Sequence, residues 1–197
     1  MASIEHITIE TTESTFGGFY AEALGINTRV RAQVSQAPTD GFRGFILGLV
    51  VAQPATVDTF IASALDAGAT SLKPPTKSMW GYGGAVHAPD GTVVTFASSS
   101  KKNTGPGSRE IDELVLQLGV ADVAASRQFY TERGFPATKS YGRKYVEFDS
   151  GPVSLTLNRR DALAKTVGLS PEGSGSHRLI IGGNIGSLVD PDGYAWE

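Results

Sequence analysis

The chain has 197 residues, a formal net charge of −3 and no cysteine. A nearly balanced charge provides no basic field for nucleic acid, and the missing thiols exclude disulfides, thiolate metal sites and thiol catalysis. The longest apolar stretch, 45–52, has about eight residues against the ~20 of a membrane span, and the N-terminus lacks the pattern of a signal peptide. We therefore expect a cytoplasmic protein without nucleic-acid or membrane partners.

The first half of the chain predicts strands that alternate with helices. Alternating polar and apolar residues with β-branched side chains indicate the first strand. Pro54 opens the second helical pattern, and Gly25 and Gly68 follow the two patterns at the position where glycine commonly ends a helix. The expected strands are 5–10, 42–51 and 93–96, and the expected helices are 19–24 and 54–67.

The second half predicts a similar order with a shorter end. A helical pattern over 126–133 ends at Gly134, and its expected N-cap is Asp122 or Ser126. An insertion after this helix carries a second, short helical pattern. The counterpart of helix 54–67 is missing, so the second half reads as a trimmed copy of the first. The short helix is expected at 162–167 and the last strand at 194–196.

Sequence motifs recur in the same order in both halves, which predicts two copies of one unit. The matching pairs are 4–10 with 111–117, 19–22 with 129–132, 41–48 with 175–182, and 88–91 with 190–193. Between the copies lies a polar segment rich in Gly and Ser, which is typical of a linker. We expect an N-terminal module at 1–97, a linker at 98–109 and a C-terminal module at 110–197.

These motifs resemble the vicinal oxygen chelate superfamily, which includes glyoxalase I, bleomycin resistance proteins and extradiol dioxygenases. The resemblance rests on His6 in the first strand, the Phe-Tyr pairs at 19–20 and 129–130, the segment 80–84, and the two Pro-Asp-Gly turns. It implies an α+β fold of two βαβββ modules whose curved mixed sheets form a cup. Because members of this superfamily differ in activity, the resemblance predicts the fold more closely than the function.

In that superfamily a divalent metal, when present, is held in the cup by the first and last strands of each module. The repeat places these positions at His6, Thr95, Glu113 and Glu197. Imidazole and carboxylate groups suit Zn, Mn, Ni or Fe, whereas the hydroxyl of Thr95 is a poor ligand. The resemblance thus implies a possible metal site of His6, Glu113 and Glu197, and the loss at Thr95 favours a protein without metal.

Aromatic and cationic side chains are the candidates for ligand binding. Trp80 and Tyr82 lie in a glycine-rich segment and are expected, with Thr95, to contact a flat ligand at the mouth of the cup. Tyr141 and Arg143 occupy the matching region of the second half, where Arg143 is expected to meet an anionic or carbonyl group. These residues could instead have structural roles. Trp80 would then fill the end of the barrel, and Tyr141 and Arg143 would lie on a solvated strand edge.

The candidates for catalysis are few. Glu197 is a candidate metal-binding catalytic residue, and His177 is a candidate general base because an ordinary imidazole titrates near neutral pH. His87 is expected to be an exposed histidine at the end of a strand. The chain contains neither a nucleophile elbow nor a phosphate-binding glycine loop.

Three functions are compatible with these residues. The first is a protein of the bleomycin-resistance type that binds a small, planar organic molecule for sequestration, resistance or metabolite handling. The second is a divalent-metal-dependent lyase or isomerase of glyoxalase type, or an enzyme related to the dioxygenases. The third is a structural domain with a filled cup. A homodimer is expected, because the trimmed module leaves a sheet face without its helix.

Overall fold

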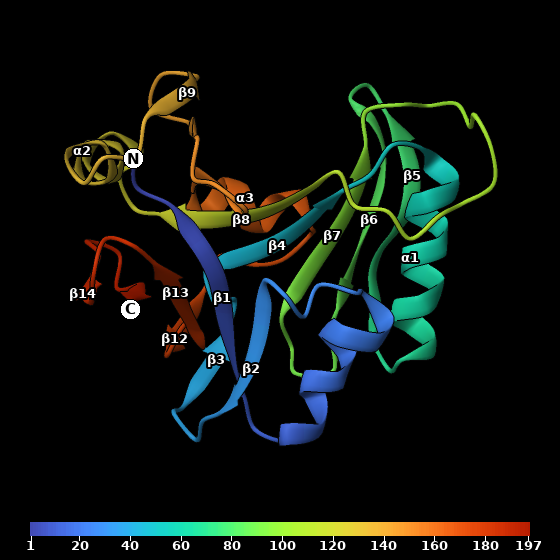
Figure 1. The fold of residues 1–197 in the computed structure, drawn as a ribbon, viewed down its shortest axis with the longest axis horizontal. Helices are drawn as coiled ribbons and strands as arrows, with labels where there is room; N and C mark the ends of the chain where they lie inside the picture. The colour runs from blue at the N-terminus through green and yellow to red at the C-terminus, as the bar shows by residue number, and fades with distance from the viewer.

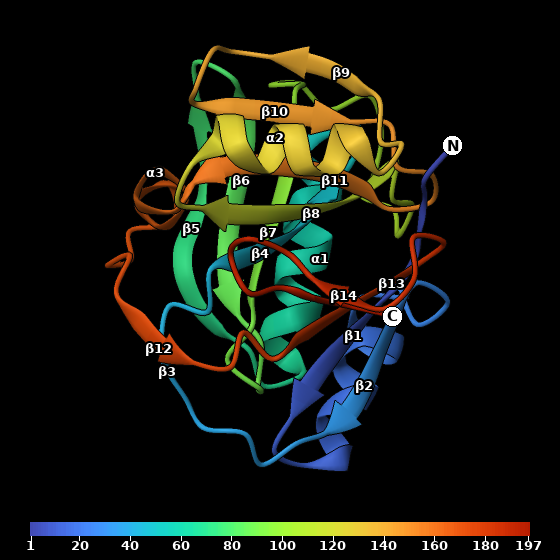
Figure 2. The same ribbon diagram turned by 90° about the vertical axis from the view of Figure 1, so that its left-hand side faces the viewer.

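Eight strands form one strongly curved, mixed sheet. They are β4 (Phe45–Val50), β5 (Thr70–Ser78), β6 (Gly81–His87), β7 (Val93–Ser98), β8 (Glu113–Val120), β9 (Ala137–Ser140), β10 (Tyr145–Phe148) and β11 (Ser154–Arg159). Their order is β5-β6-β7-β4-β8-β11-β10-β9 in this computed structural model, which describes residues 1–197. Strands β8 to β11 run across the direction of β5 to β7, so the sheet forms an open cup (Figure 2).

Each half of this sheet is a continuous piece of the chain. The first piece runs β4, helix α1 (Pro54–Asp66), β5, β6 and β7, and the second runs β8, helix α2 (Val123–Glu132), β9, β10 and β11. Strands β4 and β8 join the pieces in antiparallel pairing. Both pieces therefore have the βαβββ order, and the α+β class with curved mixed sheets is confirmed. The sheet is continuous from one piece to the other, because β4 pairs with β8. The module boundaries at 97 and 110 therefore stay a prediction from the sequence repeat.

A second sheet of five strands packs against the first. Its order is β14-β15-β13-β1-β2, and β1 pairs with β13 as β4 pairs with β8, in antiparallel fashion. Its strands are β1 (Ile4–Thr11), β2 (Val30–Val34), β13 (Leu179–Gly183), β14 (Leu188–Val189) and β15 (Ala195–Trp196). A small pair, β3 (Thr39–Gly41) with β12 (Gly173–Gly175), completes the strands. The smaller helical elements are η1 (Ser14–Phe16), η2 (Phe19–Ala23) and α3 (Arg160–Thr166).

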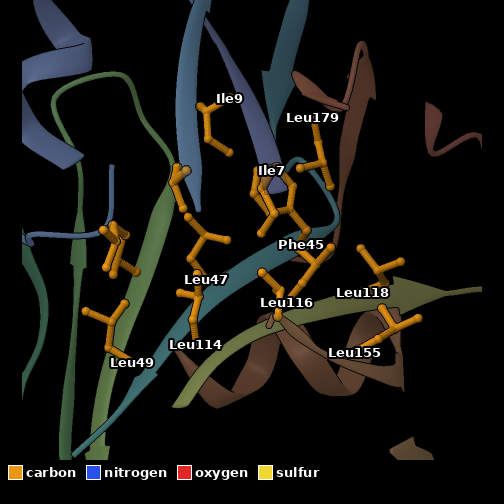
Figure 3. Close-up of a cluster of buried hydrophobic side chains, with 14 of the residues drawn as sticks. Ile7, Ile9, Phe45, Leu47, Leu49, Leu114, Leu116, Leu118, Leu155 and Leu179 are labelled. Carbon is orange, nitrogen blue, oxygen red and sulfur yellow. The ribbon is translucent and has the colours of Figure 1, made fainter. Parts of the chain in front are cut away.

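The main core fills the space between the two sheets (Figure 3). Ile7 of β1 and Leu179 of β13 point toward Phe45 and Leu118 on the outer face of the curved sheet. Helix α1 covers the same outer face at β5 to β7, and α2 covers it at β10 and β11 (Figures 1 and 2). The outer face of the curved sheet is therefore covered. Polar side chains of the two sheets can form a site on the concave face of the curved sheet or on the far side of the second sheet.

The repeated motifs make equivalent hydrogen bonds. The Tyr20 hydroxyl donates to Asp90 Oδ2 at 2.6 Å, and the Tyr130 hydroxyl donates to Asp190 Oδ2 at 2.6 Å. All four residues are buried. Burial is the main cause that raises the pKa of both tyrosines well above the ordinary value, so both phenols stay protonated donors. Each copy thus anchors its Pro-Asp-Gly turn to its first helix through the same pair of side chains.

The predicted helix ends hold with one correction, in the first helical pattern. Asp122 caps α2 by accepting from the backbone N–H of Ala124 and Ala125, whereas Ser126 donates to Asp192 instead. Gly68 follows α1 with a φ of 92°, the left-handed conformation that glycine adopts without strain. The residues 19–24 form a wide π-type turn rather than a regular α-helix. None of the helices has the length and apolar character that crossing a membrane requires.

Candidate functional site

Polar side chains of the central strands meet on the concave face of the curved sheet. Gln117 of β8 donates to the hydroxyl of Thr95 of β7 at 3.4 Å, across the intervening strand β4. Gly48 of β4 lies between them, and a Cβ there would come within 3.0 Å of the Gln117 amide nitrogen. A side chain at position 48 would therefore crowd the Gln117 amide.

Helix α3 covers the middle of this concave face. Its Leu163 and Ala164, with Val167 just beyond it, pack on Ile46 and Val93 in an apolar cluster separate from the main core. The sequence insertion predicted this helix, at 162–167, but its position in the cup had no sequence signal. Part of the cup is therefore filled by the chain itself, and cavities remain on both sides of the helix.

One cavity, of about 310 Å³, lies beside Trp80. The Trp80 side chain is at the turn between β5 and β6 and is 85 % exposed. Thr95 and Gln117 lie on the strand side, and Val167 lies on the α3 side. Trp80 and Thr95, two of the predicted ligand-binding residues, thus line one cavity.

The other predicted ligand-binding residues point elsewhere. The Tyr82 hydroxyl donates to Asp58 of α1 at 2.7 Å, so this side chain is directed to the helix-covered face although its residue borders the cavity. Tyr141 and Arg143 lie near the β9–β10 turn, at the opposite end of the sheet order from β5 and β6. Tyr141 packs against Tyr145, with 5.9 Å between ring centroids.

A carboxylate-rich group occupies the second half of the concave face. Glu113 accepts a hydrogen bond from the hydroxyl of Ser154, and the Tyr145 hydroxyl donates to Glu147 at 3.1 Å. Burial, together with the charges of Glu147 and Glu113, raises the pKa of Tyr145. Sequence reasoning missed Tyr145 and Glu147, although their alternation with buried Val146 and Phe148 is a signal that they share a face.

His6 and Glu197 form a separate pair on the five-stranded sheet. His6 Nε2 lies 3.2 Å from Glu197 Oε1, and the two side chains are 17 % and 52 % exposed. The imidazole rests over Gly182 of β13, where any Cβ would collide with the ring. Ile7, the next residue of β1, points into the core, so His6 points away from it.

The expectation that His6, Thr95, Glu113 and Glu197 converge is therefore wrong. Thr95 and Glu113 lie on the concave face of one sheet, whereas His6 and Glu197 lie on the second sheet, and the shared core separates the sheets. No group of three or more His, Cys, Asp or Glu side chains in the chain is arranged to hold a metal ion. Because metal sites in proteins usually need three or four such donors, the donor set does not fit the metal that the resemblance implies.

His177 is held by backbone carbonyls on both sides. Nδ1 lies 2.6 Å from the Arg43 carbonyl oxygen, and Nε2 lies 3.1 Å from the Asp192 carbonyl oxygen. The ring also stacks on Tyr194 at 4.2 Å between centroids. A neutral ring has one N–H and can donate to only one of these carbonyl oxygens, but both nitrogens are directed at the backbone, and His177 lines neither cavity beside α3. This geometry does not support the general base.

Solved structures with the same arrangement of strands exist. Glyoxalase I from Zea mays superposes with a TM-score of 0.59 at 15 % identity, over 100 % of this chain and 91 % of that chain. A candidate dioxygenase from Bacillus subtilis subsp. subtilis str. 168 superposes with a TM-score of 0.57 at 11 % identity, over 96 % of this chain and 71 % of that chain. The chain has the glyoxalase fold.

The glyoxalase fold confirms the structural part of the predicted resemblance to the vicinal oxygen chelate superfamily. No protein-family model matches the sequence, and no curated protein is significantly similar to it. At these identities the likeness concerns the fold, and the function has to be argued from the side chains in the cup.

Proposed function

We propose that this protein with the glyoxalase fold binds a small, planar organic molecule in the cavity beside Trp80. The observation that carries the proposal is the 85 % exposure of the Trp80 side chain at the edge of a cavity of about 310 Å³. A large aromatic ring that remains exposed beside a concave surface is free to stack on a flat partner.

The rest of the cavity wall suits the same ligand. Gly81, Gly83 and Gly84 contribute only backbone to the wall that includes Trp80, so no side chain of these three residues narrows the cavity. Gln117 and Thr95 offer an amide and a hydroxyl on the strand side, and Lys73 adds a cation that contacts the Thr166 carbonyl oxygen of α3 at 3.3 Å. A flat molecule with a few hydrogen-bonding substituents would satisfy both walls.

The Trp80 proposal is tested by NMR, because the chain contains only two tryptophans. Trp196 is 3 % exposed and serves as an internal control. We expect 2-naphthol to shift the indole N–H signal of Trp80 saturably and to leave that of Trp196 in place. The non-planar analogue decahydro-2-naphthol should bind weakly or not at all.

Two substitutions sharpen this test. Trp80→Ala should weaken 2-naphthol binding by about 3- to 10-fold, the range expected for loss of an aromatic pair. Met79→Ala is the matched control, since Met79 is also exposed in the same turn and does not line the cavity. Equal binding of the planar and non-planar compounds, or equal effects of the two substitutions, would contradict the proposal.

The metal-dependent lyase or isomerase has weaker support, because only His6 and Glu197 of its three donors lie together. Metal analysis of protein purified without chelator distinguishes it. We expect no stoichiometric Zn, Mn, Ni or Fe, and one equivalent that disappears in Glu197→Gln would instead support the enzyme. The homodimer and the cytoplasmic location stay predictions.

A further inference from the structure

A second cavity, of about 270 Å³, lies on the other side of the α3 segment. It shares no lining residue with the Trp80 cavity. Phe42, Val93 and Leu169 form an apolar wall, and Arg43 and His87 place nitrogen atoms beside it. The cavity is thus a separate compartment with a different chemical character.

Arg43 brings a half-buried positive charge that forms no salt bridge, although the Asp90 carboxylate attracts it from a longer distance. Its guanidinium donates to the carbonyl oxygen of Asp90 and to the hydroxyl of Thr92, both uncharged acceptors. The Asp90 carboxylate is already used by the Tyr20 hydroxyl at 2.6 Å and by the Thr92 backbone N–H at 2.8 Å. Neither of the ion pairs in the structure includes Arg43. A partly buried cation whose neighbouring carboxylate is bonded to other donors is incompletely compensated, and an anion in the cavity would pair with it directly.

His87 adds a ring with unused hydrogen-bonding capacity. Strand β6 directs it to this cavity, and neither ring nitrogen has a partner in the chain. Burial, followed by the charge of Arg43, lowers the pKa of His87, so the ring is neutral at pH 7 and retains one N–H donor. His87 ends β6, as the sequence predicted, but it is only partly exposed, because the segment after α3 lies over this side of the cup.

We infer that this cavity binds a small organic acid with one negative charge and an apolar body. Its carboxylate would pair with the Arg43 guanidinium and accept from His87, while its apolar part would contact Phe42, Val93 and Leu169. Glu172 is exposed at the edge of the cavity and repels additional negative charge, which favours a monocarboxylate over a dicarboxylate or a phosphate. This inference is independent of the Trp80 proposal, since the cavities have no residue in common.

Benzoate and its neutral isostere benzamide test the inference. The chain has three histidines, so the ring proton signals can be resolved and assigned by NMR. We expect benzoate to shift the His87 signals saturably, to leave those of His6 and the Trp80 indole signal in place, and to bind at least about 10-fold more tightly than benzamide. Equal affinity for the two compounds, or a benzoate shift confined to Trp80, would overturn the inference.

Variants of the two charged residues provide the second readout. Arg43→Gln should weaken benzoate binding by about 10-fold or more, because it removes the counter-charge. Glu172→Gln should tighten it by about 2- to 3-fold, because it removes a like charge from an exposed position. Since Arg43 also supports the turn at Asp90, its variant can fail to fold. In that case an unchanged or weaker affinity in Glu172→Gln overturns the inference.

Discussion

Replacing Asp190 with alanine is expected to reduce the free energy of unfolding by about 3 kcal/mol or more. One carboxylate oxygen accepts from the Tyr130 hydroxyl at 2.6 Å, and the other accepts from the backbone N–H groups of Tyr194 at 2.8 Å and Asp192 at 3.0 Å. Tyr130 and Tyr194 are buried, so their donors would lose a partner without gaining water. Urea unfolding followed by far-UV circular dichroism measures the loss.

Two further variants control this measurement. Asp161→Ala breaks an exposed pair with Arg159 and should change stability by less than about 0.5 kcal/mol. Asp190→Asn keeps a side-chain oxygen and removes the charge. A loss below about 1 kcal/mol in Asp190→Ala would show that the turn satisfies its donors in another way.

The Asp190 carboxyl group should also make the stability of the protein depend on pH. Burial raises the pKa of Asp190 above its ordinary value of 3.8, so the folded protein holds this proton more tightly than the unfolded chain. Protonated Asp190 makes its full contribution to stability below pH 3.8, the ordinary pKa of the group. This contribution is lost as the pH rises through the pKa of Asp190 in the folded protein. The stability of the parent protein relative to Asp190→Asn should therefore fall as the pH rises above 3.8. A difference that grows with pH would contradict the burial of a charged group.

Replacing Gly44 with alanine is expected to cost about 3 kcal/mol or more. Gly44 has a φ of 90°, and an added Cβ would collide with the Arg160 guanidinium and come within 2.6 Å of the Tyr194 hydroxyl. Its carbonyl oxygen also accepts from the Gly119 backbone N–H and from the Tyr194 hydroxyl, both at 2.7 Å. Gly44 therefore joins β4, β8 and the C-terminal turn at one point.

Gly25→Ala is the matched control for this prediction. Gly25 also has a positive φ, 68°, but a Cβ there would meet no atom within 4 Å. It should cost about 1 kcal/mol, which is the price of the left-handed conformation alone. The difference between the two variants in thermal and urea unfolding measures the close packing at Gly44, and equal losses would show that this packing is not tight.

Local features of the fold were predictable because they depend on neighbouring residues. Gly68 and Gly134 end helices, Asp122 caps α2, and the two Pro-Asp-Gly turns were recognised from residue type alone.

The site was less predictable because it depends on which strands become neighbours. His6 and Glu113 hold matching positions in the repeat, and the resemblance suggested that matching positions share one cup. The structure pairs β4 with β8 and β1 with β13, so these matching residues belong to different sheets. Equivalence in a repeat is a local property, whereas proximity follows from long-range strand pairing that no short motif encodes.

The separate packing of α3 has a consequence for how much the cup can hold. Its apolar cluster has seven buried residues, against 39 in the main core, and the two clusters are not continuous. A small, independent cluster can open while the main core stays folded, at a free energy well below that of global unfolding. The largest molecule that the cup admits is then governed by the opening equilibrium of one short helix rather than by the dimensions of the closed cavities.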